Sequence, residues 1–413
     1  MHIGITIGIQ KENESIWING IKMNAIFLAK ALKKAGHKVT ILDTSSELKE
    51  ITKDNIDFDI KEFPTKKFNT DVKNVELLIM LGTSLVTEIL LKWKKEDPRR
   101  KVIKYQCGNN YVIDMERSIF ANERELKDPG FITEYQRGVL DGIWYVPQQG
   151  HQNRSYYAAL MDLPIEKVIP VPFVWDPMFL DRDIDLFSNR LEKGELNLSE
   201  SGFPVYIPGR NKDTLRYFIM EPNNNVVKFA QIPLLIIELL KRTGQKIGMT
   251  HIISGAGLIK NPYWQSIIRK LDLCKAGDTN LRTHGRLPII PAIAKFADVV
   301  VSHQWHNPLN YAYLDTLYLQ YPLIHNADMI KDAGYYYPDF DAHQGMQELK
   351  YAIENHDSRL NEYNENTERV LERYTTYNDG MIEIYKKLVD NIKYDKIDSS
   401  LSYEYNWETN LYK

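Results

Sequence analysis

The sequence is poor in cysteine and has no apolar run long enough to cross a membrane. Its 413 residues include two cysteines, Cys107 and Cys274, whose separation favours a reducing compartment over a disulfide framework. The N-terminal MHIGITIGI has no preceding basic region, so it does not resemble a secretory signal. The most apolar stretch, IPLLIIELL at 232–240, is shorter than the roughly 18–20 residues that a membrane span requires. We therefore expect a soluble, cytoplasmic protein without membrane insertion.

Motifs of several common metal and cofactor sites are also absent. No H-E-x-x-H sequence or Cys/His cluster occurs, which argues against zinc. The pairs Asp57/Asp59 and Asp183/Asp185 have D-x-D spacing, but they lie in polar, linker-like sequence and are expected at the solvated surface. Neither a complete G-x-G-x-x-G nor a G-x-x-x-x-G-K-[ST] pattern is present, so neither a nicotinamide enzyme nor a P-loop kinase is indicated. We expect no metal site and no prosthetic group.

The charge is close to balanced. A net charge of −3 at pH 7 gives no overall attraction to nucleic acid or to an anionic membrane. Hydrophobic residues make up 43% and charged residues 26% of the chain, as is typical of a soluble globular protein. A chain of this length is too long for one ordinary core, so two domains are expected.

Short apolar strands alternate with helical segments along both halves of the chain, which predicts parallel sheets covered by helices on both faces. In the first half, an apolar strand at 3–9 is followed by a helix that ends at Gly36 and by the strand KVTILD. The polar stretch 181–203 has the composition of an interdomain connection, and the alternation begins again after it. We predict an α/β protein with two Rossmann-like, doubly wound domains at 1–178 and 203–375, followed by a C-terminal helix and tail at 376–413.

The most informative segment is SHQWHNPLNYAYLDTLYLQYPLIHN, at 302–326. Asn307-Pro308 suits the start of a helix, because Asn caps free amides and Pro fits the first helical position. Asp315 then lies in mid-helix, where Asp is a poorer helix former than Ala by about half a kcal/mol. No cation lies three or four residues away to pair with it. We infer that its carboxylate meets a distant partner or a ligand.

Ligands of doubly wound sheets bind beyond the carboxyl ends of the strands, and four such loops stand out. In EPNNNVVKFAQ, Lys228 precedes a helix N-terminus and predicts a phosphate site, with a solvated loop lysine as the alternative. In THGRLP, Gly285 permits close backbone approach and Arg286 offers a guanidinium, although a plain turn would look the same. His303 is either a ligand-binding or a hydrogen-bonded core histidine. The fourth loop, ESIWING, places Gly20 at the start of a helix.

The order of these features resembles the nucleotide-sugar-binding half of the GT-B glycosyltransferases. A loop with a phosphate-binding lysine, a glycine loop, the strand ADVVVSH and an acid-x7-acid element occur in that order. Asp315, with Pro322 seven residues later, matches the second acid, which in the family holds the donor ribose, and Asn307 stands at the position of the first. The stretch NGIKMNAIFLAKALKKAGHKVTILD looks like the first-domain opening of such enzymes, whose two domains face a central cleft. The resemblance implies a nucleotide-sugar co-substrate, such as a UDP-sugar, bound by Gly20, Glu221, Asn223, Lys228, Gly285, Arg286, His303, Asn307, Asn310, Tyr311 and Asp315.

Longer strings, among them SIWINGIKMN, EPNNNVVK and KDAGYYYP, resemble a family of phage and bacterial proteins that carry a domain of unknown function. Some T-even-like phages encode GT-B enzymes that attach glucose or arabinose to 5-hydroxymethylcytosine in DNA, and the Lys/Asn/Ile-rich composition fits such a genome. Double-stranded hydroxymethylated DNA, in the host cytoplasm, is therefore one expected acceptor. Binding DNA requires cationic groups. Such groups are clustered around Trp93, at Lys92, Lys94, Lys95, Arg99, Arg100 and Lys101. The end of a helix on a solvated face would explain this cluster equally well.

The resemblance also implies an acceptor base in the first domain. Asp114 and Glu116, expected in a loop after KVIKYQCGNNY, are the candidates, with a surface role as the alternative. Two other functions stay open. One is transfer to a bacterial surface glycan, and the other, because Asn307 replaces an acid, is nucleotide-sugar binding without catalysis.

Overall fold

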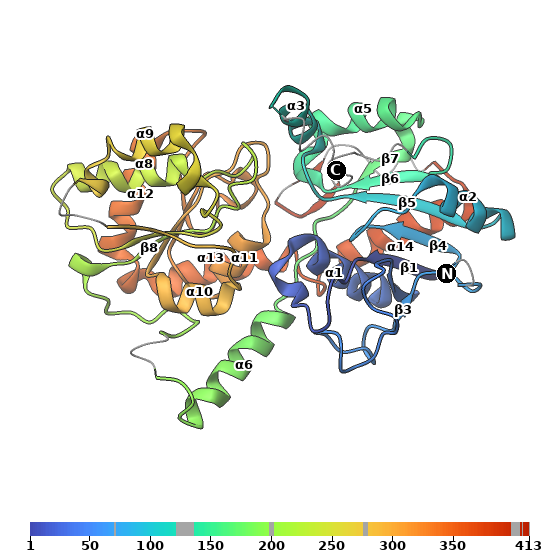
Figure 1. Cartoon of the computed structure of the whole chain (residues 1–413), viewed down its shortest axis with the longest axis horizontal. Coiled ribbons are helices and arrows are strands. Elements are labelled where there is room, and N and C mark those ends of the chain that lie inside the picture. The colour runs from blue at the N-terminus through green and yellow to red at the C-terminus, as the bar shows by residue number, and fades with distance from the viewer. Residues whose placement is uncertain are drawn as a thin grey trace. The chain divides into compact units, whose positions relative to one another are not determined.

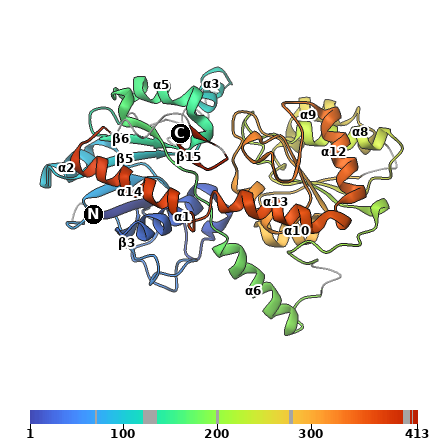
Figure 2. The same ribbon diagram turned by 180° about the vertical axis from the view of Figure 1, so that it is seen from behind.

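The structure is a computed structural model that describes residues 1–69, 72–120, 136–197, 202–275, 280–397, 405–406 and 408–412. The chain forms two compact units. Unit 1 comprises Met1–Asp176 together with Arg373–Lys413, and unit 2 comprises Pro177–Glu372 (Figures 1 and 2). Each unit is built on its own parallel sheet. Among the described residues, no helix combines the length and the apolar character needed to cross a bilayer.

Unit 1 contains a seven-stranded parallel sheet with strand order β3-β2-β1-β4-β5-β6-β7. Its strands are β1 (His2–Ile7), β2 (Lys38–Asp43), β3 (Thr65–Lys67), β4 (Leu77–Met80), β5 (Lys101–Gln106), β6 (Gly142–Tyr145) and β7 (Val168–Pro170). The longer helices of this unit are α1 (Gly20–Lys34), α2 (Thr87–Glu96), α3 (Asn110–Phe120), α5 (Gly150–Met161) and α14 (Asp379–Tyr394). A short antiparallel pair, β14 (Tyr405–Asn406) and β15 (Leu411–Tyr412), follows.

Helices cover both faces of the unit 1 sheet. On one face, Trp93 of α2 and Tyr157 of α5 share an apolar cluster with Leu78 and Val102 of the strands. On the other face lie α1 and α14, which contact each other (Figure 2). The C-terminal part of the chain therefore returns to unit 1 and completes the core of that unit.

Local sequence explains where α1 begins and ends. The side chain of Asn19 accepts a hydrogen bond from the Ile21 amide at 3.1 Å and so caps the first turn. Gly36 has a φ of +86°, the left-handed conformation that ends a helix and that glycine adopts without strain. The apolar positions between these ends, including Phe27 and Leu32, are fully buried against the sheet.

Unit 2 contains a six-stranded parallel sheet with strand order β10-β9-β8-β11-β12-β13. Its strands are β8 (Tyr217–Ile219), β9 (Thr250–Ile252), β10 (Leu281–Thr283), β11 (Val299–Val301), β12 (Leu323–His325) and β13 (Tyr335–Tyr336). The longer helices are α6 (Met178–Glu192), α8 (Gln231–Arg242), α9 (Pro262–Ile268), α10 (Ile289–Phe296), α11 (Tyr311–Tyr318), α12 (Ala342–Asn355) and α13 (Leu360–Glu372). Helices α8 and α12 pack closely where Gly345 of α12 faces Ile236 of α8. A Cβ at Gly345 would lie only 2.6 Å from Ile236 Cδ1, so a larger residue would not fit there.

The predicted architecture of two doubly wound parallel sheets is confirmed. Some elements differ from the prediction. The polar stretch at 181–203, expected to be a connection, lies partly in helix α6. Strands β3 and β13 were not predicted, because TKK and YY are too short and, in β3, too polar to resemble buried strands.

Candidate functional site

Both sheets reverse their winding direction at one place. In unit 2, β8 is followed by β9 and β10 on one side and by β11, β12 and β13 on the other, so the reversal lies between β8 and β11. Loops that leave the carboxyl ends of two such strands run in opposite directions and leave a crevice, where ligands of this class of sheet bind. In unit 1 the equivalent place lies between β1 and β4.

Four side chains form a row across the carboxyl edge of the unit 2 sheet. Val299 pairs with Tyr217, so Glu221 and His303, each four residues further on, stand level with each other. The pairings Val301 with Ile324 and Ile324 with Tyr335 extend the same level to Asn326 and Tyr337. The row crosses the reversal between β8 and β11, and it consists of Glu221, His303, Asn326 and Tyr337.

Glu221 links three segments of this edge. Its Oε1 accepts hydrogen bonds from the His303 amide at 3.0 Å and from the Tyr313 hydroxyl at 3.3 Å. The carboxyl group is buried, with the residue 1% exposed. Burial raises its pKa to about 7, although the nearby Lys228 ammonium and the hydrogen bonds act in the opposite direction.

Lys228 lies in the loop between β8 and α8, three residues before the helix. The Trp305 amide donates to the Val227 carbonyl at 2.8 Å and holds this loop against the segment that follows β11. With the Asn307 amide in the orientation that satisfies its neighbours, its oxygen accepts from Lys228 Nζ at 3.2 Å and its nitrogen donates to the Leu309 carbonyl at 3.1 Å. Burial lowers the pKa of Lys228 to about 8, with Glu221 opposing the shift. Lys228 therefore still carries its positive charge at pH 7 and loses it as the pH rises through about 8.

Asn223 supports the same loop from within. Its Nδ2 donates to the carbonyls of Glu221 at 2.7 Å and Ile253 at 3.1 Å, and its Oδ1 accepts from the Ala230 amide at 2.9 Å. Its φ of +54° is a left-handed conformation that Asn tolerates better than most residues. In the structure Asn223 therefore shapes the loop that carries Lys228.

His303 is buried, and burial lowers its pKa to about 4, so the ring is neutral at pH 7. Its Nδ1 lies 3.0 Å from the hydroxyl of Tyr337, and its ring packs edge-on against Phe340 with the centroids 4.6 Å apart. Two alternatives were expected for this residue, ligand contact or a hydrogen-bonded core position. The structure shows the core contacts.

Helix α11 starts later than expected. The prediction of a start at Asn307-Pro308 was wrong, because the helix begins at Tyr311 with Asn310 as its cap. The side chain of Asn310 accepts from the Ala312 amide at 3.2 Å, whereas the Asn307 amide donates to Gln304 Oε1 at 2.6 Å and stays outside the helix. Asp315 lies within the helix, as expected, and is 3% exposed.

The glycine loop after β10 is fixed by the loop after β9. The Gly255 amide donates to the His284 carbonyl at 2.9 Å, and the Ser254 amide donates to the Gly285 carbonyl at 3.2 Å. Arg286 follows on the exposed part of this loop. The loop therefore lies at the carboxyl edge of the sheet, with β9 and β8 between its strand and β11.

The predicted acceptor residues of unit 1 lie on a helix. The expectation of a loop for Asp114 and Glu116 was wrong, because α3 extends from Asn110 to Phe120. Asp114 Oδ2 accepts a hydrogen bond from the Tyr156 hydroxyl at 2.7 Å, and Glu116 is half-buried. Gly20 is the first residue of α1, as expected.

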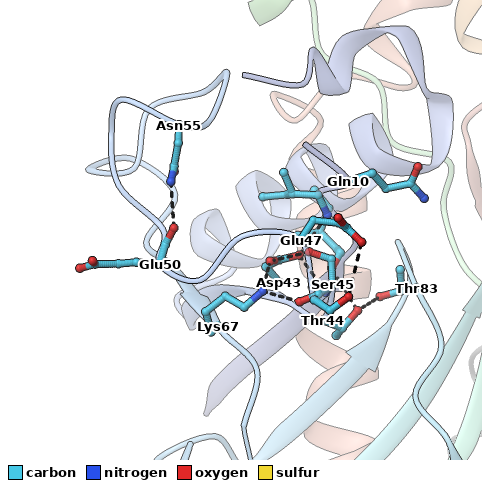
Figure 3. Close-up of polar contacts among 12 residues, drawn as sticks. Gln10, Asp43, Thr44, Ser45, Glu47, Glu50, Asn55, Lys67 and Thr83 are labelled. Carbon is cyan, nitrogen blue, oxygen red and sulfur yellow. Dashed lines mark hydrogen bonds and ion pairs between the residues drawn. The ribbon is translucent and has the colours of Figure 1, made fainter. Parts of the chain in front are cut away.

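A polar network at the carboxyl end of β2 is built around Asp43 (Figure 3). Its carboxylate accepts from the Ile9 amide at 3.0 Å, from Ser45 at 3.0 and 3.1 Å, and from Lys67 at 2.6 Å. In dinucleotide-binding domains an acid beyond β2 holds the ribose. Here the carboxylate accepts its hydrogen bonds from side chains and amides of the protein itself.

The cations of the basic cluster at 92–101 differ in their surroundings. Trp93 is fully buried in the core. Arg100 is buried and donates to the Trp93 carbonyl at 2.7 Å and to Glu96 at 2.9 Å. Three further cations pair with acids, namely Lys94 with Asp141 at 2.8 Å, Arg99 with Asp97 at 2.9 Å and Lys101 with Asp141 at 3.5 Å, while Lys92 and Lys95 are exposed.

Three site residues were missed in the sequence, Tyr313, Asn326 and Tyr337. Tyr313 and Tyr337 are buried and form hydrogen bonds with Glu221 and His303, respectively. Tyr337 lies in KDAGYYYP, where only the register of β13 tells which of three tyrosines faces His303. Within the described ranges, no three His, Cys, Asp or Glu side chains are grouped so that they could hold a metal ion.

A family model described as "Protein of unknown function (DUF2827)" matches residues 3–389. No curated protein matches the chain. The fold is similar to that of the catalytic domain of starch synthase IV from Arabidopsis thaliana bound to ADP and acarbose, with a TM-score of 0.55, 10% identity and coverage of 95% of this chain and 99% of the other. It is also similar to a sucrose-phosphate synthase from Thermosynechococcus elongatus (TM-score 0.52, 10% identity, coverage 96% and 100%).

A third similar structure is an alpha-glucosyltransferase in complex with UDP and a 13-mer DNA containing an HMU base (TM-score 0.53, 13% identity, coverage 95% and 99%). At these identities the similarity shows the fold alone. The two parallel α/β sheets have the GT-B glycosyltransferase-like fold.

Proposed function

We propose that this chain, which belongs to the DUF2827 family, is a glycosyltransferase that takes a sugar from a nucleotide-sugar donor. The observation that carries the proposal is the position of Lys228 beside Asn307, where the winding of the unit 2 sheet reverses. Proteins of similar fold have been solved with ADP or UDP bound. A lysine at this place is suited to the pyrophosphate of such a donor.

The leaving group of the reaction would be a nucleoside diphosphate, which carries more negative charge as the glycosidic bond breaks. Helix α8 is twelve residues long, and no side chain caps its N-terminus. Its first amides and Lys228 would therefore stabilise the developing charge together. Arg286, on its exposed loop, is a further cation for the phosphates. Asp315 is proposed to hold the ribose hydroxyls, as the resemblance implies.

Replacing Lys228 with alanine tests the donor site. Loss of a charged hydrogen bond costs about 1.5–3 kcal/mol, which corresponds to a roughly tenfold to hundredfold weaker affinity. We expect the Kd for UDP, measured by calorimetry, to rise by this factor and hydrolysis of UDP-glucose to slow. Lys241→Ala, near the C-terminal end of the same helix, is the matched control and should change neither quantity. Unchanged UDP binding in Lys228→Ala would remove this lysine from the site.

A DNA acceptor carrying 5-hydroxymethylcytosine is the second, finer proposal. It is supported by the fold shared with a glucosyltransferase that was solved with DNA. Asp114, which accepts from Tyr156, or Glu116 would then act as the base. Incubation with UDP-glucose and hydroxymethylated DNA, followed by mass spectrometry of the nucleosides, tests it. A glycosylated cytosine that is lost in Asp114→Asn supports the proposal, and donor hydrolysis without labelled DNA favours a glycan acceptor instead.

Binding without catalysis is the remaining alternative, since Asn307 stands where the family has an acid. Turnover of UDP-sugars by the wild-type protein would exclude it. Tight binding of UDP-sugars with neither hydrolysis nor transfer would support it.

A further inference from the structure

We propose that His303 Nε2 and Glu221 Oε2 form a subsite that accepts hydrogen bonds from hydroxyl groups of the bound nucleotide sugar, either on the transferred sugar or on the ribose. The inference rests on the proposed function and goes beyond it, because it assigns a chemistry to two side chains of the row. It follows from the directions of the hydrogen bonds within the row.

The tautomer of His303 is fixed by its neighbour. The Tyr337 hydroxyl has one proton, and it donates that proton to the Ser302 carbonyl at 2.9 Å, because a carbonyl oxygen can only accept. The contact of 3.0 Å between the same hydroxyl and His303 Nδ1 must therefore have the imidazole as donor. A neutral ring with its proton on Nδ1 carries a lone pair on Nε2. His303 thus presents an acceptor, and Nε2 has no partner among the described residues.

In its carboxylate form, Glu221 presents a second acceptor. Its Oε1 receives the His303 amide and the Tyr313 hydroxyl, whereas its buried Oε2 has no partner at hydrogen-bond distance in the described part of the chain. The Ser302 hydroxyl, which is also unpaired there, interacts with this carboxyl group and lowers its pKa. Leaving a buried polar atom unpaired destabilises the folded protein. Both residues are more than nine-tenths buried, and each lies two residues beyond the end of one of the adjacent strands β8 and β11. Two such atoms in one row indicate a binding function.

The chemistry of these atoms selects the ligand. A lone pair and a carboxylate oxygen repel phosphate oxygens and attract O–H donors. The cation of the site, Lys228, lies in the neighbouring loop and is suited to the phosphates. A nucleotide sugar offers both kinds of group, anionic oxygens for Lys228 and hydroxyls for His303 and Glu221. A free inorganic phosphate would satisfy only the lysine.

Two substitutions of His303 separate its two nitrogens. The amide nitrogen of asparagine can take the place of Nδ1 and keep the donor to Tyr337, but His303→Asn has nothing at the position of Nε2. Glutamine instead places its terminal amide near the position of Nε2, so His303→Gln keeps an acceptor there. We expect His303→Asn to bind UDP-glucose about three- to tenfold more weakly than the wild type, because one hydrogen bond is lost, and His303→Gln to recover part of that affinity. Glu221→Gln, which turns Oε2 into a donor, should weaken binding in the same way.

Three ligands identify which hydroxyl is held. If the subsite holds the transferred sugar, His303→Asn binds UDP-glucose more weakly than the wild type does and binds UDP with the same affinity. If it holds the ribose, binding of UDP-glucose and of UDP is weakened in His303→Asn. Wild type and variant then bind 2′-deoxy-UDP alike if the 2′-hydroxyl is held, and the variant binds it more weakly if the 3′-hydroxyl is held. Equal binding of all three ligands by wild type and His303→Asn overturns the inference while leaving the proposed function intact. Failure of the wild type to bind any of them overturns both.

Nitrogen-15 NMR of the wild-type imidazoles provides a test that does not depend on a variant folding. We expect His303 to show a protonated Nδ1 and an unprotonated Nε2, and the Nε2 resonance to move upfield when UDP-glucose is added. A proton on Nε2, or an Nε2 resonance that does not respond to saturating ligand, contradicts the assignment.

Discussion

At the scale of single residues, the site is controlled by two ionisable groups whose pKa values are shifted toward each other. Burial raises the pKa of Glu221 to about 7 and lowers that of Lys228 to about 8. The pKa of each group would lie closer to its ordinary value if the group were exposed to solvent. Protonation of both groups therefore changes within the neutral range, and both donor binding and stability should depend on pH there.

The affinity for UDP should fall as the pH rises through about 8. Phosphate binding requires the ammonium form of Lys228, which is lost above its pKa. Calorimetric titrations between pH 7 and 9 should show a rising Kd, with a limiting slope of about tenfold per pH unit. In Lys228→Arg the guanidinium stays charged, so the Kd should be nearly constant over this range. A wild-type profile as flat as that of Lys228→Arg would show that Lys228 is not the group that binds phosphate.

Glu221→Gln should become more stable relative to the wild type as the pH rises from 5 to 7. A carboxyl whose pKa is raised from 4.5 to about 7 on folding stabilises the native state below pH 4.5, and this contribution is lost as the pH rises through about 7. Glutamine does not titrate. The difference in free energy of unfolding should grow with pH, by up to about 3 kcal/mol. Denaturant unfolding at several pH values measures it, and a difference independent of pH would mean that Glu221 keeps an ordinary pKa.

At the scale of elements, helix α11 carries two site residues, Tyr313 and Asp315, and begins at the cap residue Asn310. A change in the cap should therefore affect the site as well as the helix. Asn310→Ala should cost about 1 kcal/mol of stability and should also weaken UDP binding, since the first turn of the helix loosens. Asn261→Ala is the control. Its side chain caps α9 by accepting from the amides of Tyr263 and Trp264 at 2.9 and 3.1 Å.

Thermal melts and UDP titrations of both cap variants separate the two effects. The control should lose similar stability without losing affinity for UDP. Equal UDP affinity in Asn310→Ala and wild type would show that α11 does not position a donor-binding group.

Most elements could be predicted from sequence, because buried parallel strands are runs of apolar residues between helices of regular period. Strand β2, KVTILD, was predicted with the observed bounds. The start of α11 was predicted wrongly, since Asn307 and Asn310 are both good cap residues. The choice between them depends on Gln304, whose side chain accepts a hydrogen bond from the Asn307 amide. Tertiary contacts of this kind are not visible in a local pattern.

The same reason limits what could be predicted of the site. Lys228, Glu221 and His303 were selected because they follow predicted strands, and strand ends converge at one edge of a sheet. Their contacts with one another depend on the register between strands. The same register places Tyr337 next to them. The pairing of Lys94 and Lys101 could not be predicted, because their partner Asp141 is some 40 positions away in the sequence, directly before β6.

At the scale of the whole molecule, the two units differ in how the chain builds them. Unit 2 is one continuous segment, whereas unit 1 is completed by residues after 372. Helix α14 supplies Tyr385, whose ring contacts Trp144 edge-to-face at 6.3 Å and whose hydroxyl donates to the Pro172 carbonyl at 2.7 Å. The C-terminal helix is therefore part of the core of unit 1.

Tyr385→Ala should destabilise unit 1 selectively. Truncation of a large buried aromatic side chain costs about 3–5 kcal/mol. Hydrogen exchange followed by mass spectrometry should show faster exchange in β5 and β6, with protection in β8 and β11 unchanged. Uniform loss of protection in both units would mean that they unfold as one cooperative body, and unchanged protection of β6 would contradict the role of α14 in the core.

The central claim is that the carboxyl edge of the unit 2 sheet, where β8 and β11 meet, holds the diphosphate of a nucleotide sugar. A crystal structure of the protein with UDP-glucose tests it most directly. The pyrophosphate should lie at Lys228 and the N-terminus of α8, with a ligand hydroxyl within hydrogen-bond distance of His303 Nε2. Nucleotide density at any other edge, or a phosphate that does not touch Lys228, would contradict it.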